Sequence, residues 1–139
     1  MKAFIDTNVW IDFILERAPY YEAAACLLSL ACDGRVDVCI SSLTVVNTHY
    51  VCVERAGMNA ATVREKTRAL SDIVEICNVG EADIMRAYND DWADFEDSVQ
   101  HSTTLHASAT CIVTRNKSDF SHSLIPVFSP REIIDKVLE

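Results

Sequence analysis

The sequence predicts a three-layer α/β/α domain with a central, mostly parallel five-stranded sheet. Two observations lead to this prediction. Short β-rich apolar segments recur along the chain, and most segments between them carry apolar residues at helical spacing. Strands that alternate with helices in this way form a parallel sheet that is covered on both faces. We expect residues 1–139 to form one domain, because this length is ordinary for a single hydrophobic core.

The predicted strands are short segments that are rich in apolar and β-branched residues. They are KAFI (2–5), VDVCI (36–40), IVEIC (73–77), TCIVT (110–114) and IPVF (125–128). Between the first two, Ala23, Leu27 and Leu30 recur at the spacing of one helix face, and the segment 95–105 repeats this pattern. The last connection, 116–124, is too short for a crossover helix and is predicted to be a loop.

Helix ends are marked by capping and breaking residues. Asp33 and Gly34 close the first long helix, and Gly57 followed by Asn59 separates two later helices. Residues 129–132, Ser-Pro-Arg-Glu, form a capping box with proline at the first helical position. These signals agree with the alternation of strands and helices.

The composition limits the classes of partner and compartment. The chain has 12 Lys and Arg against 21 Asp and Glu, so its net charge of −9 excludes binding of polyanions by bulk electrostatics. The longest apolar stretch, 23–32, is about half of what a bilayer crossing needs, so we expect a cytoplasmic protein without membrane association. Six cysteines without a C-x-x-C pair are expected to be reduced, buried thiols.

Polar side chains gather where the predicted strands end. They are Asp6 and Asn8 after the first strand, Ser41 and Ser42 after the second, and Thr114, Asn116 and Asp119 after the fourth. The carboxyl ends of parallel strands share one edge of the sheet, so these side chains should converge there. The acidic segment 89–100 begins a helix that Asp91 or Asp94 can cap. Asp94 and Asp97 are three residues apart and can face the same edge.

Carboxylates that converge raise one another's pKa unless a cation lies among them. A site made of oxygen ligands, without a histidine cluster, suits Mg²⁺ or Mn²⁺. Such a cation lowers the pKa of an attacking water and neutralises a scissile phosphate. The sequence therefore predicts a metal-dependent phosphodiester hydrolase.

Four segments together resemble the PIN-domain family, which includes the VapC-type toxins of bacterial toxin–antitoxin systems. They are FIDTNVWID (4–12), ISSLTVVNTHYV (40–51), DFEDSVQHSTTLHASATCIVTRNKSDF (94–120) and IPVFSPREII (125–134), in this order. The resemblance covers essentially the whole chain. It implies a metal-dependent endoribonuclease that cleaves single-stranded RNA, with a small antitoxin protein as a partner and a homodimer as its assembly.

The resemblance also implies roles for individual residues. Asp6, Asp97 and Asp119 correspond to three acidic positions that hold metal, and Asp94 is a supporting catalytic acid. Thr7, Asn8, Thr114 and Asn116 match the polar neighbours of these acids. Within this set, Thr7 and Asn8 are expected to cap the helix and to orient the Asp6 carboxylate by hydrogen bonds.

One residue departs from the pattern of the family. Similar proteins have glutamate in the helix after the second strand, where this sequence has Asn47. An amide oxygen can still contact a metal or its bound water, but without a charge it should weaken metal binding and make a second metal ion less expected. The alternative function is therefore a catalytically weakened PIN-like module that binds RNA or a protein.

Substrate contacts have several candidates. Arg115 and Lys117 flank Asn116 and could hold phosphates, although a solvated basic turn is an equal alternative. Trp10, Trp92 and Tyr50 either stack on bases or fill the core. A haloacid-dehalogenase-type phosphatase is a weaker interpretation, because that chemistry needs aspartate two residues after the nucleophile and position 8 is Asn.

Overall fold

The computed structural model of residues 1–139 contains one five-stranded sheet in the order β3-β2-β1-β4-β5. The strands are β1 (Lys2–Ile5), β2 (Asp37–Ser41), β3 (Val74–Cys77), β4 (Cys111–Val113) and β5 (Val127–Phe128). All neighbouring strands pair in parallel, with Ala3 beside Val38 on one side and beside Cys111 on the other. The predicted fold class and all five predicted strands are confirmed.

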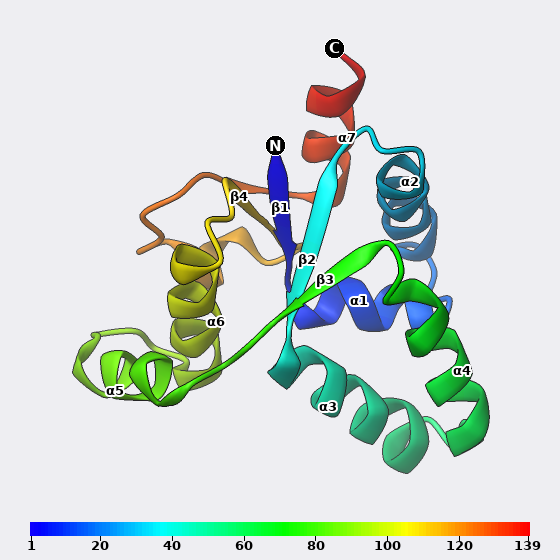
Figure 1. The fold of residues 1–139 in the computed structure, drawn as a ribbon, viewed down its shortest axis with the longest axis horizontal. Coiled ribbons are helices and arrows are strands. Elements are labelled where there is room, and N and C mark those ends of the chain that lie inside the picture. Colours follow the sequence, from blue (N-terminus) through cyan, green and yellow to red (C-terminus); the bar gives the residue numbers. More distant parts are fainter.

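The helices form two layers that cover the sheet. They are α1 (Thr7–Ile14), α2 (Tyr21–Cys32), α3 (Ser42–Tyr50), the π-helix η1 (Val51–Arg55), α4 (Ala60–Leu70), α5 (Glu81–Asn89), α6 (Phe95–His106), the 3₁₀-helix η2 (Lys117–Phe120) and α7 (Pro130–Leu138). Helices α5 and α6 lie on one side of the sheet, whereas α1 to α4 lie on the other, with α7 packed against α2 (Figure 1).

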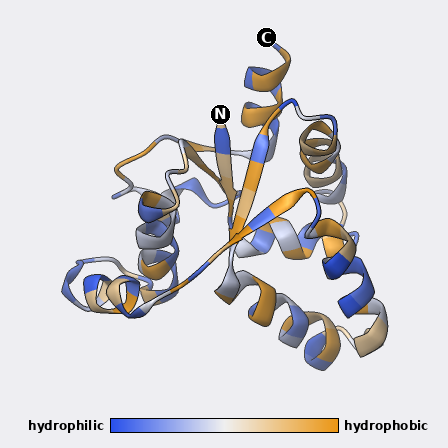
Figure 2. Cartoon of the chain, in the orientation of Figure 1, coloured by the Kyte–Doolittle hydropathy of each residue, from blue (hydrophilic) through white to orange (hydrophobic).

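Alternation along each strand divides the apolar side chains between the two layers. Ala3 and Ile5 of β1 belong to the large core under α1, α2 and α7, whereas Phe4 between them packs with Cys39 and Cys77 on the α6 side. Hydrophobic residues run along the middle of β2, while the turns of α3 and α4 alternate between hydrophilic and hydrophobic (Figure 2). This pattern is expected of a buried sheet with amphipathic cover.

The predicted helix ends are also confirmed. Gly34 after α2 and Gly57 before α4 both adopt a φ of +72°, a conformation that glycine reaches without steric cost. The Ser129 hydroxyl accepts a hydrogen bond from the Glu132 N–H at 3.2 Å, and Ser129 N–H donates to the Glu132 carboxylate at 2.8 Å. The predicted capping box therefore starts α7.

Two expectations need correction. The connection predicted as a loop includes the short helix η2, because Phe120 is buried and draws the segment 117–120 against the core. All six cysteines are free thiols, but Cys26 and Cys32 are exposed on α2, because they lie off its buried face. None of the helices combines the length and apolar composition that a bilayer crossing requires.

Candidate functional site

The edge of the sheet where β1 ends is hollowed into a cleft of about 380 Å³, which we call the acidic cleft. Its lining includes the carboxylates of Asp6, Asp94, Glu96, Asp97 and Asp119. They come from the end of β1, the start of α6 and the helix η2, which are far apart in the sequence. The structure therefore brings all four predicted acids together and adds Glu96, which nothing in the sequence pattern distinguishes from its acidic neighbours.

Asp6 is fixed in position by two hydrogen bonds. Its Oδ1 accepts from the Thr7 N–H at 2.8 Å, and its Oδ2 accepts from the Thr114 hydroxyl at 2.9 Å. Asp6 is itself the N-cap of α1, because its side chain receives the first free N–H of the helix. The expectation that Thr7 and Asn8 cap this helix is therefore wrong. Asn8 is exposed and lines the acidic cleft, where its amide is free for another partner.

A buried polar network lies beneath Asp6. The Thr7 hydroxyl is 2.8 Å from the Thr44 hydroxyl, and Gln100 Nε2 donates to both oxygens, at 2.9 and 3.0 Å. Thr44 is also hydrogen-bonded to Ser41, the N-cap residue of α3, whose hydroxyl accepts from the Thr44 N–H. This network ties α1, α3 and α6 together under the cleft. Gln100 was not predicted, because a polar residue beside the core residue Val99 carries no signal of its own in the sequence.

The start of α6 is fixed by the predicted cap. Asp94 is the N-cap residue, and its Oδ1 accepts from the Asp97 N–H at 2.9 Å. This bond orients the first turn of α6, so that Asp97 lines the acidic cleft. The Asp97 carboxylate itself has no hydrogen bond within the protein. It is therefore free to bind a ligand from solvent.

The segment after β4 contributes in two different ways. The Thr114 hydroxyl is buried and connects Asp6 to this segment, because it also accepts from the Asn116 N–H at 3.1 Å. The Asn116 carbonyl in turn accepts from the Asp119 N–H at 3.0 Å, which forms the turn that presents Asp119 to the cleft. Thr114 and Asn116 thus support Asp6 and Asp119 from outside the cleft lining.

Burial and neighbouring charges raise the pKa of Asp6 to about 6. Burial is the largest cause, and the Glu96 and Asp119 carboxylates add to it. Hydrogen bonds from Thr114 and Thr7 lower the pKa but do not cancel the effect. A nearby cation would stabilise the ionised form of a carboxyl group in this environment and lower its pKa.

The pKa of Asp97 is raised further, to about 7. Burial is again the largest cause, followed by the carboxylates of Asp94, Asp6, Asp119 and Glu96. Four acidic neighbours around a carboxylate without a hydrogen bond are the electrostatic setting that a divalent cation relieves. The donor set fits Mg²⁺ or Mn²⁺, because all of its atoms are oxygens. No group of three or more Asp, Glu, His or Cys side chains is already arranged to hold a metal ion, so binding would require these side chains to move inward.

Asn47 lines the acidic cleft, as the resemblance to PIN domains implied. Its Nδ2 donates to Glu96 Oε1 at 3.3 Å. This bond lowers the pKa of Glu96, although burial and the adjacent Asp94 carboxylate have the larger, opposite effect and leave it raised. The amide at position 47 therefore lies beside a carboxylate that enters the cleft from α6.

The two basic candidates for substrate binding are paired elsewhere. Arg115 Nε donates to Asp12 Oδ2 at 3.0 Å, and its guanidinium lies 4.1 Å from the centre of the Tyr20 ring. Lys117 Nζ is 3.1 Å from both carboxylate oxygens of Glu132. Neither residue lines the acidic cleft. Their role in substrate binding stays a prediction.

The aromatic candidates separate clearly in the structure. Trp10 is 2% exposed and belongs to the core. Trp92 packs against His101, with ring centres 4.8 Å apart, and against Phe120 at 5.8 Å. Tyr50 is 55% exposed and lines the acidic cleft. Of these three residues, Tyr50 is therefore the one that is placed to contact a ligand there.

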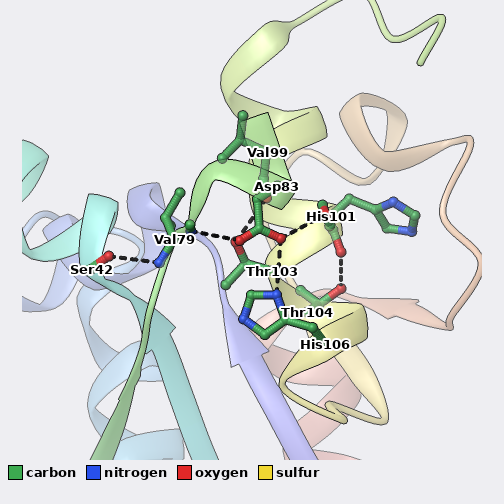
Figure 3. Close-up of polar contacts among 10 residues, drawn as sticks. Ser42, Val79, Asp83, Val99, His101, Thr103, Thr104 and His106 are labelled. Carbon is green, nitrogen blue, oxygen red and sulfur yellow. Dashed lines mark hydrogen bonds and ion pairs between the residues drawn. The ribbon is translucent and has the colours of Figure 1, made fainter. Parts of the chain in front are cut away.

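Another buried carboxylate, Asp83, anchors α6 from the side of α5 (Figure 3). Its oxygens accept from the Ser102 hydroxyl at 2.8 Å and the Gly80 N–H at 2.9 Å, and Oδ1 lies 3.0 Å from His106 Nδ1. Because these partners satisfy the buried charge, the cluster stabilises the packing of the two helices. It thereby holds in place the helix whose first turn carries Asp97.

The sequence model of a family described as PIN domain matches residues 2–118 of this chain. No curated protein sequence gave a match. Among solved structures, a toxin–antitoxin complex from Klebsiella pneumoniae is similar, with a TM-score of 0.66 and 21% identity over 92% of this chain and 97% of that chain.

Two further structures are similar over most of their length. VapBC2 from Rickettsia felis, bound to a DNA fragment from its promoter, gives a TM-score of 0.64 and 16% identity over 93% of this chain and 98% of that chain. VapC20 from Mycobacterium tuberculosis, a toxin that cleaves the sarcin–ricin loop, gives 0.62 and 18% over 79% of this chain and 86% of that chain. At identities this low, the structural similarity shows a shared fold and no more.

Proposed function

The chain belongs to the PIN-domain family, and from this premise we propose that it is a divalent-metal-dependent endoribonuclease that cleaves single-stranded RNA. The observation that carries the proposal is the acidic cleft, where Asp6, Asp97 and Asp119 meet from three separate segments. Unpaired RNA suits a site at the edge of a sheet, because its backbone and bases are accessible there.

Each residue has a distinct role in this proposal. Asp6, Asp97 and Asp119 hold Mg²⁺ or Mn²⁺, and Asp94 fixes the helix turn that presents Asp97. Bound in the cleft, the cation supplies an activated water and neutralises the scissile phosphate. The Thr114 hydroxyl donates to Asp6 Oδ2 and so fixes the orientation of the carboxylate that would hold the cation.

The biological setting belongs to the same proposal. Similar structures come from toxin–antitoxin systems, so we infer that this chain is the toxin of such a pair and acts on cytoplasmic RNA. A small antitoxin protein would be its partner, and a homodimer its assembly. Co-expression with the product of an adjacent reading frame, followed by affinity purification and light scattering, tests the partner and the assembly together.

The test of the enzymatic proposal is metal-dependent cleavage. Purified protein is expected to cleave a single-stranded RNA in Mg²⁺ or Mn²⁺, and EDTA is expected to abolish cleavage because the carboxylates alone cannot activate water. Gel analysis of labelled RNA, with added Mn²⁺ to restore activity after EDTA, measures this directly. Cleavage that persists in EDTA would reject the metal-dependent mechanism.

The second candidate function is a weakened module that binds RNA or protein, and the neutral Asn47 in the cleft favours it. Asn47→Glu is expected to tighten Mn²⁺ binding about tenfold, equivalent to ~1.4 kcal/mol, because it adds one negative charge to the site. Cleavage at limiting metal should rise in parallel. Asn47→Asp is the shorter control. Calorimetric titration of the three proteins measures the affinities, and equal values would show that residue 47 does not affect the metal.

A further inference from the structure

The end of α3 continues into the π-helix η1, and this irregular turn borders the acidic cleft. Tyr50, Val51 and Arg55 all line the cleft. The turn is closed by an i to i+5 hydrogen bond, in which the Ala56 N–H donates to the Val51 carbonyl at 3.0 Å. π-turns inside helices are rare and are frequent at functional sites.

The π-turn brings together two side chains that a regular helix would separate. Residues five apart in an α-helix lie on different faces. Here the Arg55 guanidinium carbon lies 5.9 Å from the centre of the Tyr50 ring, within the range of a cation–π contact. The aromatic ring and the cation therefore form a continuous surface at the side of the cleft.

Arg55 is the one basic residue that lines the acidic cleft, and it is exposed. It forms no ion pair, although five carboxylates line the same cleft. Four other Lys and Arg side chains are paired with acids, among them Arg17 and Arg115 with Asp12. A guanidinium that is not neutralised by the protein is available to bind an anion.

The charge of the protein makes this cation important for a polyanionic substrate. A net charge of −9 repels phosphate groups at long range, so RNA must be attracted by local contacts. Arg55 can bind a phosphate through two N–H groups, and the exposed Tyr50 ring can stack on an unpaired base. A strand whose scissile phosphate lies among the carboxylates would extend over this pair.

We propose that Tyr50 and Arg55 form a subsite for single-stranded RNA beside the acidic cleft, in which Arg55 binds a phosphate adjacent to the scissile one and Tyr50 stacks on a base. This proposal rests on the proposed nuclease function and adds the residues that hold the substrate. It explains how an acidic chain retains an RNA strand at an acidic site.

The test measures RNA binding separately from cleavage. Fluorescence anisotropy of a labelled single-stranded RNA decamer, with full-length protein in EDTA, gives the affinity without turnover. Arg55→Ala is expected to weaken RNA binding about tenfold. The slope of log affinity against log salt concentration should also fall, by the amount that the loss of about one phosphate contact produces. Tyr50→Ala should weaken binding several-fold and Tyr50→Phe should not, because phenylalanine keeps the stacking face.

Arg64→Ala is the matched control, because Arg64 is exposed on α4 and its removal changes the net charge equally. Binding that falls equally in Arg55→Ala and Arg64→Ala would overturn the subsite. Thermal melting of each variant checks that the fold is intact, as expected for two exposed side chains.

The failure of the subsite and the failure of the nuclease proposal give different results. RNA binding that depends on Arg55 in a protein without metal-dependent cleavage would support the subsite and reject the enzyme. Metal-dependent cleavage with unchanged RNA affinity and KM in Arg55→Ala and Tyr50→Ala would overturn the subsite alone. Unchanged RNA binding combined with lost binding of a co-expressed protein partner would also overturn it and assign the pair to protein docking.

Discussion

Asp97→Asn is expected to reduce RNA cleavage by about a hundredfold or more while the protein remains folded. The Asp97 carboxylate has no hydrogen bond within the protein and lies among the charges of Asp6, Asp94 and Asp119. Asparagine keeps the size of the side chain but removes an anionic oxygen from the metal site. Single-turnover cleavage of labelled RNA at saturating Mn²⁺ measures the loss.

The same substitution is expected to stabilise the metal-free protein at high pH. The pKa of Asp97 rises from its ordinary value of 3.8 in the unfolded chain to about 7 in the folded protein. Between these values the folded state binds a proton that the unfolded state has released, so stability falls as the pH rises through this window. Asparagine cannot titrate and should remove this loss.

The expected gain for Asp97→Asn at pH 8 is about 1 kcal/mol, less than the pKa shift alone implies, because solvent screens a half-buried group. At pH 5 the gain should be smaller. Urea denaturation in EDTA at both pH values measures it. Asp135→Asn is the control, since Asp135 is exposed on α7 and changes the net charge equally. Wild-type cleavage by Asp97→Asn would show that Asp97 is not a metal ligand.

Asp6→Asn should lose cleavage to a similar extent but with a different effect on stability. Asparagine can still cap α1 through its oxygen, as Asp6 does for the Thr7 N–H. Its amide nitrogen would then face the Thr114 hydroxyl, which now donates to Asp6 Oδ2 and would have to rotate to accept. Comparison of the two variants therefore separates the loss of charge from the loss of a hydrogen bond.

The strands could be predicted because they are short segments rich in apolar and β-branched residues, and their parallel arrangement because they alternate with helices. The order of the strands could not, because it depends on which side each crossover takes and this is decided by tertiary packing. The π-turn at 51–55 was also not predictable, since i to i+5 bonding leaves no apolar repeat in the sequence. For this reason Arg55 was not recognised as a residue of the cleft.

The site was predicted in part. Asp6 and Asp119 follow strands that end at one edge of the sheet, and Asp97 lies in an acidic helix start. The resemblance to PIN domains implied these three residues as metal ligands, and the structure brings them into one cleft. Glu96 was missed, because in an acidic helix start only geometry distinguishes a cleft residue from a solvated one. Arg115 was proposed as a substrate contact from its position beside Asn116, but its pairing with a buried carboxylate depends on α1, which is distant in the sequence.

That buried carboxylate, Asp12, is 1% exposed and lies between two arginines. Its Oδ1 accepts from Arg17 Nε at 2.8 Å and its Oδ2 from Arg115 Nε at 3.0 Å. The arginines are partly exposed, with 37% and 26% of their side chains accessible. Asp12 therefore joins the end of α1 to the segment after β4, which also carries the Thr114 hydroxyl that holds Asp6.

Asp12→Ala is expected to lower the free energy of unfolding by about 3 kcal/mol. A buried ion pair adds little to stability compared with apolar residues that replace both of its partners. Removal of one partner alone is costly, because the remaining charges are left uncompensated. Here two guanidinium groups would remain close together without the anion between them. Because both can still reach water, the cost should fall at the lower end of the range for buried pairs.

Urea denaturation of Asp12→Ala, Arg115→Ala and the double variant measures this coupling. The double variant should be less destabilised than the sum of the single variants, because removal of Arg115 also removes one of the two repelling charges that Asp12→Ala exposes. Asp135→Ala, an exposed aspartate without an ion pair, should stay within about 0.5 kcal/mol of wild type. If Asp12→Ala changed the free energy of unfolding as little as Asp135→Ala, the two arginines would not need this carboxylate to compensate their charges. Arg115 would then be free to turn toward the acidic cleft, and its role as a phosphate contact would regain support.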